Sequence, residues 1–304
     1  MASWAWSPEQ EALREQARAV LERSPAPTLA EIAELGWTAI SVPEEHGGLG
    51  LGFVEEAILH EEIGRGLART VFSSTAVILP ALPPEEQARV AAGEAAWVLA
   101  LGPLVPHVAE ATDVAIIGGD GIYELVGATI EALETVDETR PVGVVAGGEA
   151  GRLLSSSELL PLIRTRSLAA LACEACGVAS AALDLAVAYT KERRQFGRVI
   201  GTYQAVAHPL ATAYVELELA RSLSLRAAWC VATATDDAGL RAAAAKAYAA
   251  ETAVTVCERA IQAHGGIGFT WEHDLHRYYK RALWIRAFEA SSAQLRSEIA
   301  DRLI

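Results

Sequence analysis

Long helix-forming segments joined by short turns make up the C-terminal half of this 304-residue chain. Helices are expected at about residues 165–194, 203–233, 236–264 and 270–288, and a last helix is expected to end near Leu303. The second and third segments are too apolar and too rich in alanine to stand alone in water, so their faces must be buried against other helices. The pattern predicts a C-terminal four-helix bundle.

Two adjacent glycines, Gly265 and Gly266, separate the third segment from the fourth. Thr270 is expected to cap the fourth helix, with Glu272 and Asp274 in its first turn, where carboxylates suit the positive end of the helix dipole. A glycine pair between two helices allows unusual backbone angles or the close approach of a ligand, and N–H groups at such a junction can bind a phosphate. The alternative is an ordinary turn in which glycine only ends the third helix.

Residues 1–95 are predicted to form an N-terminal helical domain. Ser7 is expected to cap a first helix, and a longer helix is expected at about residues 53–66. Glu61 and Glu62 on that helix are expected to lie on a solvated face.

Residues 96–155 contain short apolar runs separated by Gly, Pro and Asp, and Gly119-Asp120-Gly121 is a hairpin signal. This pattern predicts a small, antiparallel, shortened β domain. Residues 156–304 would then form the C-terminal helical bundle domain. The expected fold class is mainly α with a small β segment in the middle.

The formal net charge of −14 argues against a nucleic-acid or anionic-membrane partner. No uninterrupted apolar run reaches about 18 residues, so no membrane span is expected. The first residues lack the basic and apolar regions of a secretory signal, and a cytoplasmic protein is expected.

Two patterns could suggest a metal site. Cys173 and Cys176 form a C-x-x-C pair, but they lie in an Ala/Leu-rich helical pattern without a second pair, which favours buried packing thiols. His273 and His276 are three residues apart, but no third ligand is visible, so no metal is expected.

Three motifs in the C-terminal half resemble the acyl-CoA dehydrogenase family of flavoproteins. They are R-x-x-F-G at Arg193 to Gly197, a glutamine eight residues after the phenylalanine at Gln204, and Q-x-x-G-G-x-G at Gln262 to Gly268. The segment from Glu34 to Ala68 is also similar to the family. The resemblance covers about residues 5–95 and 165–304.

The middle of the chain departs from the family pattern. In the family, a β-barrel domain lies over the flavin and the acyl chain, and a T-E-P…G-S-D loop and a W-x-T-N segment belong to it. Both segments are absent from this sequence, and the β segment is short.

The resemblance implies that the chain binds FAD, largely the FAD held by a neighbouring subunit. Arg193 can pair with a phosphate, and Phe196 offers a ring for stacking. A dimer or tetramer, homomeric or heteromeric, is therefore expected. The residues that the resemblance assigns to FAD are Arg193, Gln195, Phe196, Gln204, Gln262, Gly265, Gly266 and Ser291.

The resemblance also implies a catalytic carboxylate. Much of the family has a Glu in a Y-E-G-T segment at a fixed interval after the glycine turn, and the same interval of 27 residues from Gln262 reaches Glu289 without a gap. The local sequence keeps the aromatic residue, the Glu and a small hydroxyl but loses the Gly. Such a base would need a raised pKa, which an apolar pocket would provide. Other members place the base on the first long C-terminal helix, where Ser167 cannot serve and Glu174 is expected to form a structural pair.

The function implied by the resemblance is FAD-dependent α,β-dehydrogenation of an acyl-CoA or acyl-carrier thioester, with an electron-transfer flavoprotein as electron acceptor. The alternative is a non-catalytic partner subunit that completes the flavin site of a longer chain. Short actinobacterial relatives that act on sterol side chains or rings combine features of both. A third alternative is a dehydrogenase fold with non-redox chemistry in a biosynthetic pathway.

Overall fold

The computed structural model describes residues 6–304. The chain forms two compact units, which are described separately. The N-terminal unit holds the described residues through Leu59 together with Ala68–Ala170, and the C-terminal unit holds His60–Leu67 and Leu171–Ile304. Two helices, α3 (Phe53–Arg65) and α6 (Leu160–Glu192), contribute residues to both units. The division at residues 95 and 155 stays a prediction.

The first helix of the N-terminal unit begins where its capping residue predicted. The Ser7 hydroxyl accepts a hydrogen bond from the N–H of Gln10, and the Gln10 side-chain oxygen accepts one from the N–H of Ser7, which forms a capping box. Thr28 and Glu31 form the same arrangement at the next helix. The helices wholly within this unit are α1 (Pro8–Arg23), α2 (Leu29–Glu34), α4 (Phe72–Ile78) and α5 (Pro84–Ala91), with short 3-10 turns at Glu44–His46 and Leu79–Ala81.

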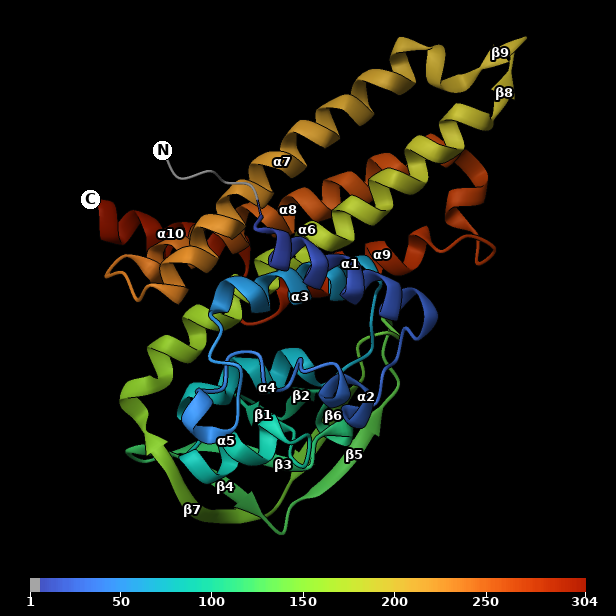
Figure 1. Cartoon of the computed structure of the whole chain (residues 1–304). Coiled ribbons are helices and arrows are strands. Elements are labelled where there is room, and N and C mark those ends of the chain that lie inside the picture. The colour runs from blue at the N-terminus through green and yellow to red at the C-terminus, as the bar shows by residue number, and fades with distance from the viewer. Residues whose placement is uncertain (1–5) are drawn as a thin grey trace. The chain divides into compact units, whose positions relative to one another are not determined.

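The strands of this unit form two small sheets (Figure 1). One has the order β1-β3-β4-β7 and the other the order β2-β6-β5. The expectation of antiparallel pairing is wrong for one pair, because β1 and β3 run parallel with Trp97 opposite Asp113. Between them the chain passes through β2 and a 3-10 turn, so it returns in its original direction. The strands are β1 (Trp97–Ala100), β2 (Leu104–Pro106), β3 (Asp113–Gly118), β4 (Gly121–Val126), β5 (Thr129–Leu133), β6 (Val142–Ala146) and β7 (Glu149–Ser156).

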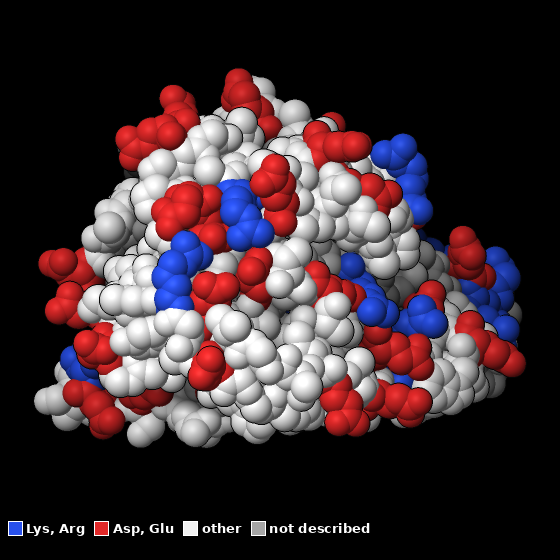
Figure 2. Space-filling view, turned by 90° about the horizontal axis from the view of Figure 1, so that it is seen from below, with Lys and Arg blue, Asp and Glu red and all other residues white. Residues whose placement is uncertain are grey.

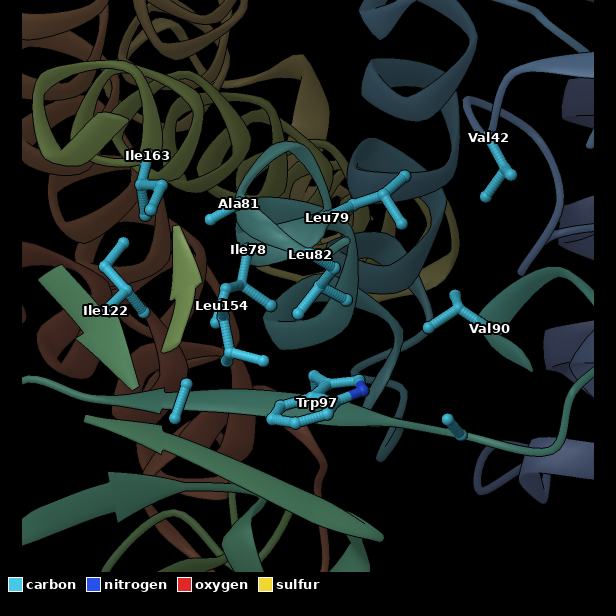
Figure 3. Close-up of a cluster of buried hydrophobic side chains, with 12 residues drawn as sticks. Val42, Ile78, Leu79, Ala81, Leu82, Val90, Trp97, Ile122, Leu154 and Ile163 are labelled. Atoms are coloured by element: carbon cyan, nitrogen blue, oxygen red, sulfur yellow. The ribbon is translucent and has the colours of Figure 1, made fainter. Parts of the chain in front are cut away.

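A hydrophobic cluster joins the first sheet to α4 and α5 (Figure 3). Trp97 of β1 and Ile122 of β4 are fully buried, and Ile78 and Leu82 from the helical side pack in the same cluster. The Trp97 ring nitrogen donates to Glu86 of α5 at 3.3 Å. Burial of apolar side chains on both sides of the contact stabilises the sheet against the helices.

The C-terminal unit is the expected helical bundle. Its helices pack through many buried alanines, whose small side chains let the helix backbones approach closely. Figure 1 shows the β8–β9 hairpin at one end of this bundle and α10 at the other. The elements are α6, β8 (Arg194–Gln195), β9 (Arg198–Val199), α7 (Gln204–Ala232), α8 (Ala238–His264), a 3-10 turn at Gly265–Phe269, α9 (Leu275–Ala287) and α10 (Ser292–Leu303).

The prediction that Glu61 and Glu62 lie on a solvated face is wrong. Both side chains are buried where α3 enters the C-terminal unit. Glu61 accepts a hydrogen bond from the Arg221 Nε atom of α7 at 2.9 Å, so a buried ion pair links the two helices. Helical spacing could not distinguish this face from a solvated one, because the arginine that satisfies the carboxylate lies 160 residues away in sequence.

Helix α6 meets the length and hydropathy requirements of a membrane span. The most apolar 18-residue window of Ser157–Glu192 is 78% buried inside the protein. A core helix of a bundle has the same composition, because all its faces contact other helices.

Acidic side chains dominate the face shown in Figure 2, with the basic side chains gathered into smaller groups among them. This distribution agrees with the net charge of −14. A face of this kind would repel nucleic-acid phosphates.

Candidate active site

The R-x-x-F-G motif lies at the exposed tip between α6 and α7. Phe196 has a φ of 49° and Gly197 a φ of 82°, so the turn between β8 and β9 lies in the left-handed region. Hydrogen bonds hold the hairpin from its base, because the N–H of Ile200 donates to the carbonyl of Arg193 at 2.8 Å and the Tyr203 hydroxyl donates to the carbonyl of Gln195 at 3.2 Å. The Phe196 ring is 93% exposed. An exposed aromatic ring on a fixed turn is suited to contact a ligand or another protein.

The glycine turn offers open space at the end of α8. Gly265 has φ 67° and ψ −141°, a conformation that residues with a Cβ atom rarely adopt. A Cβ atom added to Gly265 or Gly266 would meet no atom within 4 Å. Packing within the chain therefore does not require the glycine pair, and a ligand could approach this backbone closely.

The predicted start of the fourth helix at Thr270 is wrong, because α9 begins only at Leu275. The Thr270 hydroxyl instead donates to the carbonyl of Ile267 at 2.9 Å. The first N–H of α9 donates to His273 Nδ1 at 3.2 Å, so a histidine takes the role expected for the threonine. Glu272 therefore lies before the helix rather than in its first turn.

A stack of rings connects the two motifs. Tyr189 on α6 stacks on His264 at the end of α8 with a centroid distance of 4.3 Å, and the tilted ring of His273 has its centroid 4.4 Å from that of His264. His264 Nδ1 lies 2.8 Å from the carbonyl oxygen of Ala260. Since Tyr189 is one helical turn before Arg193, the stack places the hairpin and the glycine turn at the same end of the bundle.

His264 is expected to make the stability of the protein sensitive to acid. Burial, and to a smaller extent the neighbouring His273, lower the pKa of His264, although its bond to Ala260 opposes this shift. The unfolded chain then binds a proton more readily than the folded chain, so stability falls as the pH drops through the ordinary histidine range near 6.5. In urea titrations between pH 7.5 and 5, His264→Gln should lose less free energy of unfolding than the parent, by up to about 1 kcal/mol per pH unit.

The control for this experiment is His208→Gln, since His208 is exposed on α7. The control should keep the pH dependence of the parent. If the free energy of unfolding depends on pH equally in the parent and in His264→Gln, His264 is not the source of the acid sensitivity.

Glu289 lies on a tight turn between α9 and α10. Its φ of 61° is in the left-handed region, and the stacked rings of Trp284 and Phe288, 4.4 Å apart, precede it. The carboxylate is exposed within this chain, so the apolar pocket expected around a base is not formed by the chain alone. Ser291 caps α10, since its hydroxyl accepts from the N–H of Gln294 at 3.3 Å and donates to the Gln294 side chain at 2.9 Å.

The structure separates Glu289 from the glycine turn. Lys246 near the middle of α8 contacts the backbone on both sides of Glu289, whereas the glycine turn follows His264 at the end of α8. Between Lys246 and His264 the helix rises about 27 Å, at about 1.5 Å per residue. Glu289 and the glycine turn of one chain are therefore at different places on the bundle.

The other carboxylate considered as a base has a structural partner. Glu174 on α6 is 2% exposed and lies 2.6 Å from the fully buried Arg281 of α9. This agrees with the expectation of a structural pair. Ser167 is buried as well.

The cysteines are buried, as the packing interpretation expected. Burial raises the pKa of the Cys176 thiol to about 12, so this group stays protonated at neutral pH.

The sequence did not predict two features of this unit, the Tyr189–His264 stack and the buried Lys246. A lysine in an otherwise apolar, alanine-rich segment was the available signal for Lys246.

Comparison with known proteins gives the family of the chain. Residues 7–84 match the N-terminal domain of acyl-CoA dehydrogenases, and residues 165–304 match their C-terminal domain. The acyl-CoA dehydrogenase IpdE2 of Mycolicibacterium smegmatis is 33% identical over 301 residues, which cover 91% of this chain and 93% of that protein. The chain belongs to the acyl-CoA dehydrogenase family.

Two solved structures share the fold over almost the whole chain. A variant of the Tcur3481-Tcur3483 steroid ACAD has a TM-score of 0.85 at 27% identity and covers 97% of both chains. The ChsE4-ChsE5 complex from Mycobacterium tuberculosis has a TM-score of 0.88 at 20% identity, with 99% of this chain and 98% of that chain covered. Residues 85–164, which contain β1 to β7, lie outside both family matches.

Proposed function

We propose that this chain catalyses the FAD-dependent α,β-dehydrogenation of an acyl-CoA thioester, with Glu289 as the base. The observation that carries the proposal is the position of Glu289, on a constrained turn at the end of α9 and at the family interval from Gln262. Membership of the acyl-CoA dehydrogenase family supports the reaction class. A steroid or other lipid thioester is the proposed substrate class, since a steroid ACAD is 27% identical.

The described residues fit a flavin dinucleotide. The glycine turn leaves open space beside its backbone, and Arg193 and Phe196 are exposed at the same end of the bundle. In the proposal, Arg193 pairs with the pyrophosphate, Phe196 stacks on a ring, and the amides of Gln195, Gln204 and Gln262 and the hydroxyl of Ser291 hydrogen-bond to FAD. Bound FAD would supply the acceptor for the hydride that leaves the β-carbon of the substrate.

The role of Glu289 is to take the α-proton at a carboxylate oxygen. Within the chain this side chain is exposed. Bound substrate and a neighbouring protomer would cover it, which would raise its pKa and exclude water. An electron-transfer flavoprotein is the proposed electron acceptor, and the proposed location is cytoplasmic.

An oligomer is proposed because the glycine turn and Glu289 of one chain lie far apart. Each FAD would then contact the hairpin and glycine turn of one protomer and the Glu289 region of another. An exposed apolar stripe on α7 supports assembly. It consists of Val215, Leu219, Leu223 and Trp229, which share one helix face and are between 39% and 56% exposed.

A charge in this α7 stripe is expected to weaken the assembly. Leu219→Glu places a carboxylate where the apolar stripe would be buried, so it should shift the protein toward smaller species, with at least a tenfold weaker association. Sedimentation velocity over a concentration series measures this shift. Ser297→Glu, at an exposed position on α10, is the matched control and should sediment like the parent. An unchanged oligomer in Leu219→Glu would exclude the stripe from the interface.

The second candidate function is a non-catalytic partner subunit. The short β segment favours it. So do the Tcur3481-Tcur3483 and ChsE4-ChsE5 structures, because each is named for two different proteins. The two candidates differ in colour and in reactivity. The chain purified alone should carry FAD, and its flavin absorbance should bleach when an acyl-CoA substrate is added anaerobically. A colourless protein that gains flavin only when a longer acyl-CoA dehydrogenase chain is co-expressed would support the partner role instead.

A further inference from the structure

A buried lysine lies directly behind the turn that carries Glu289. Lys246 is part of α8, within the run of alanines from Ala242 to Ala250, and its side chain is fully buried. A lysine in such a position is unusual, because burial of an ammonium group costs free energy unless hydrogen bonds replace its hydration. The contacts of its Nζ atom should therefore show what replaces its hydration.

The Lys246 ammonium group donates its hydrogen bonds to backbone carbonyls around Glu289. Nζ lies 3.2 Å from the carbonyl oxygens of Arg286 and Phe288, and it bonds more closely to the carbonyl of Ala290. An ammonium group has three N–H donors, so these three acceptors satisfy it completely. The first acceptor lies in the last turn of α9, where the helix dipole favours a cation.

Burial lowers the pKa of Lys246 to about 8, and the nearby carboxylates Glu289 and Glu251 oppose this shift. Arg286, the other charged group at this end of α9, lies 4.0 Å from Glu251. Lys246 therefore remains charged near pH 7 and can keep all three hydrogen bonds.

The turn needs such support because of its sequence. A left-handed conformation at a non-glycine residue costs about 1–2 kcal/mol, and Glu289 adopts it with a φ of 61°. The residue after Glu289 is alanine, where the family segment Y-E-G-T has glycine. The three bonds from Lys246 restrain the carbonyls on both sides of Glu289 and so restrain the backbone from which its side chain projects.

We propose that Lys246 is the positioning residue of the base, holding the 286–290 turn so that Glu289 faces the substrate. The proposal rests on the proposed function, in which Glu289 takes the α-proton. Lys246 acts through the backbone only and touches neither the substrate nor the cofactor.

The test is Lys246→Met, which keeps the length of the side chain but removes all three donors. At saturating acyl-CoA, the rate of flavin reduction should fall by about 10–100-fold, because a small misplacement of a catalytic group costs that much. The half-saturating substrate concentration and the FAD content should stay near the parent values. Lys246→Arg, which keeps the charge and the donors, should restore part of the rate. If Lys246→Met is insoluble, Lys246→Leu, which also lacks donors, replaces it with the same expectation.

A double-mutant cycle separates positioning from general loss of stability. If Lys246 acts through Glu289, Lys246→Met should slow the parent but have little further effect on Glu289→Gln. Equal effects of Lys246→Met in both backgrounds would overturn the proposal, as would a parent-like rate in Lys246→Met.

Hydrogen–deuterium exchange tests whether Lys246 holds the 286–290 turn, and it does not require that the enzyme be active. In Lys246→Met, the amides of residues 286–291 should exchange faster than in the parent, whereas those at the β8–β9 hairpin should not change. If acyl-CoA does not reduce the parent flavin, the proposed function fails, and faster exchange at 286–291 then still supports the role of Lys246 in holding the turn. Unchanged exchange there would overturn that role independently of the reaction.

Discussion

Glu289→Gln is expected to reduce the rate of flavin reduction by acyl-CoA by about 10²–10⁴-fold, the usual contribution of a general base. Glutamine has nearly the same shape as glutamate but cannot accept the α-proton. The turn that carries residue 289 is held by hydrogen bonds from the Lys246 side chain to backbone carbonyls, so the substitution should leave the fold intact. Stopped-flow measurement of flavin bleaching at saturating substrate gives the rate.

Asp301→Asn is the control for this change, since it removes an exposed carboxylate on α10 in the same way. It should keep the parent rate. FAD content and the melting temperature should agree among the parent and both variants. A parent-like rate in Glu289→Gln with FAD bound would remove Glu289 from the mechanism and transfer the search to the carboxylates of a partner chain.

Gly177→Ala is expected to be the most destabilising of these single substitutions. In the C-terminal unit, α6 crosses α3 so closely that a Cβ atom on Gly177 would lie 1.8 Å from the carbonyl oxygen of Glu61 and 2.7 Å from the backbone nitrogen of Arg65. These atoms are backbone and cannot rotate away, so the helices would have to separate. Alanine would otherwise favour a helix by about 1 kcal/mol, but overpacking should outweigh that gain and destabilise the protein by about 3 kcal/mol.

Urea titration of the parent, Gly177→Ala and Gly102→Ala measures this effect. Gly102→Ala is the matched control, because the added Cβ atom would meet nothing within 4 Å there. Gly64→Ala should behave like Gly177→Ala, since its Cβ atom would lie 2.1 Å from the carbonyl oxygen of Glu174 on α6. If Gly177→Ala unfolds at the same midpoint urea concentration as the parent, α3 and α6 do not cross so closely.

Local sequence signals predicted many of the helices correctly. The capping residue Ser7 starts a helix as expected, and the long C-terminal segments form the bundle within a few residues of their predicted bounds. Capping and periodicity depend on residues within one or two helical turns, so one sequence contains the necessary information. The hairpin at Gly119-Asp120 was predictable for the same reason.

Local sequence signals did not predict the features that depend on contacts between residues far apart in the sequence. The strands β2, β5 and β7 were not predicted, because β2 has three residues, β5 is exposed along its whole length and β7 is exposed over most of its length. The parallel pairing of β1 with β3 depends on the path of the chain between them rather than on either strand. The burial of Glu61 is matched by Arg221 of α7, and the first N–H of α9 bonds to His273 rather than to Thr270.

The sequence by itself determined the family, because its motifs occur in a fixed order and spacing that the comparisons match. It also supplied the candidate base and the residues proposed to hold FAD. The tertiary structure alone placed Lys246 behind the turn of Glu289 and separated that turn from the glycines along α8. The reason is that motifs record which side chains are present, whereas hydrogen bonds between residues about 40 positions apart depend on how the helices pack.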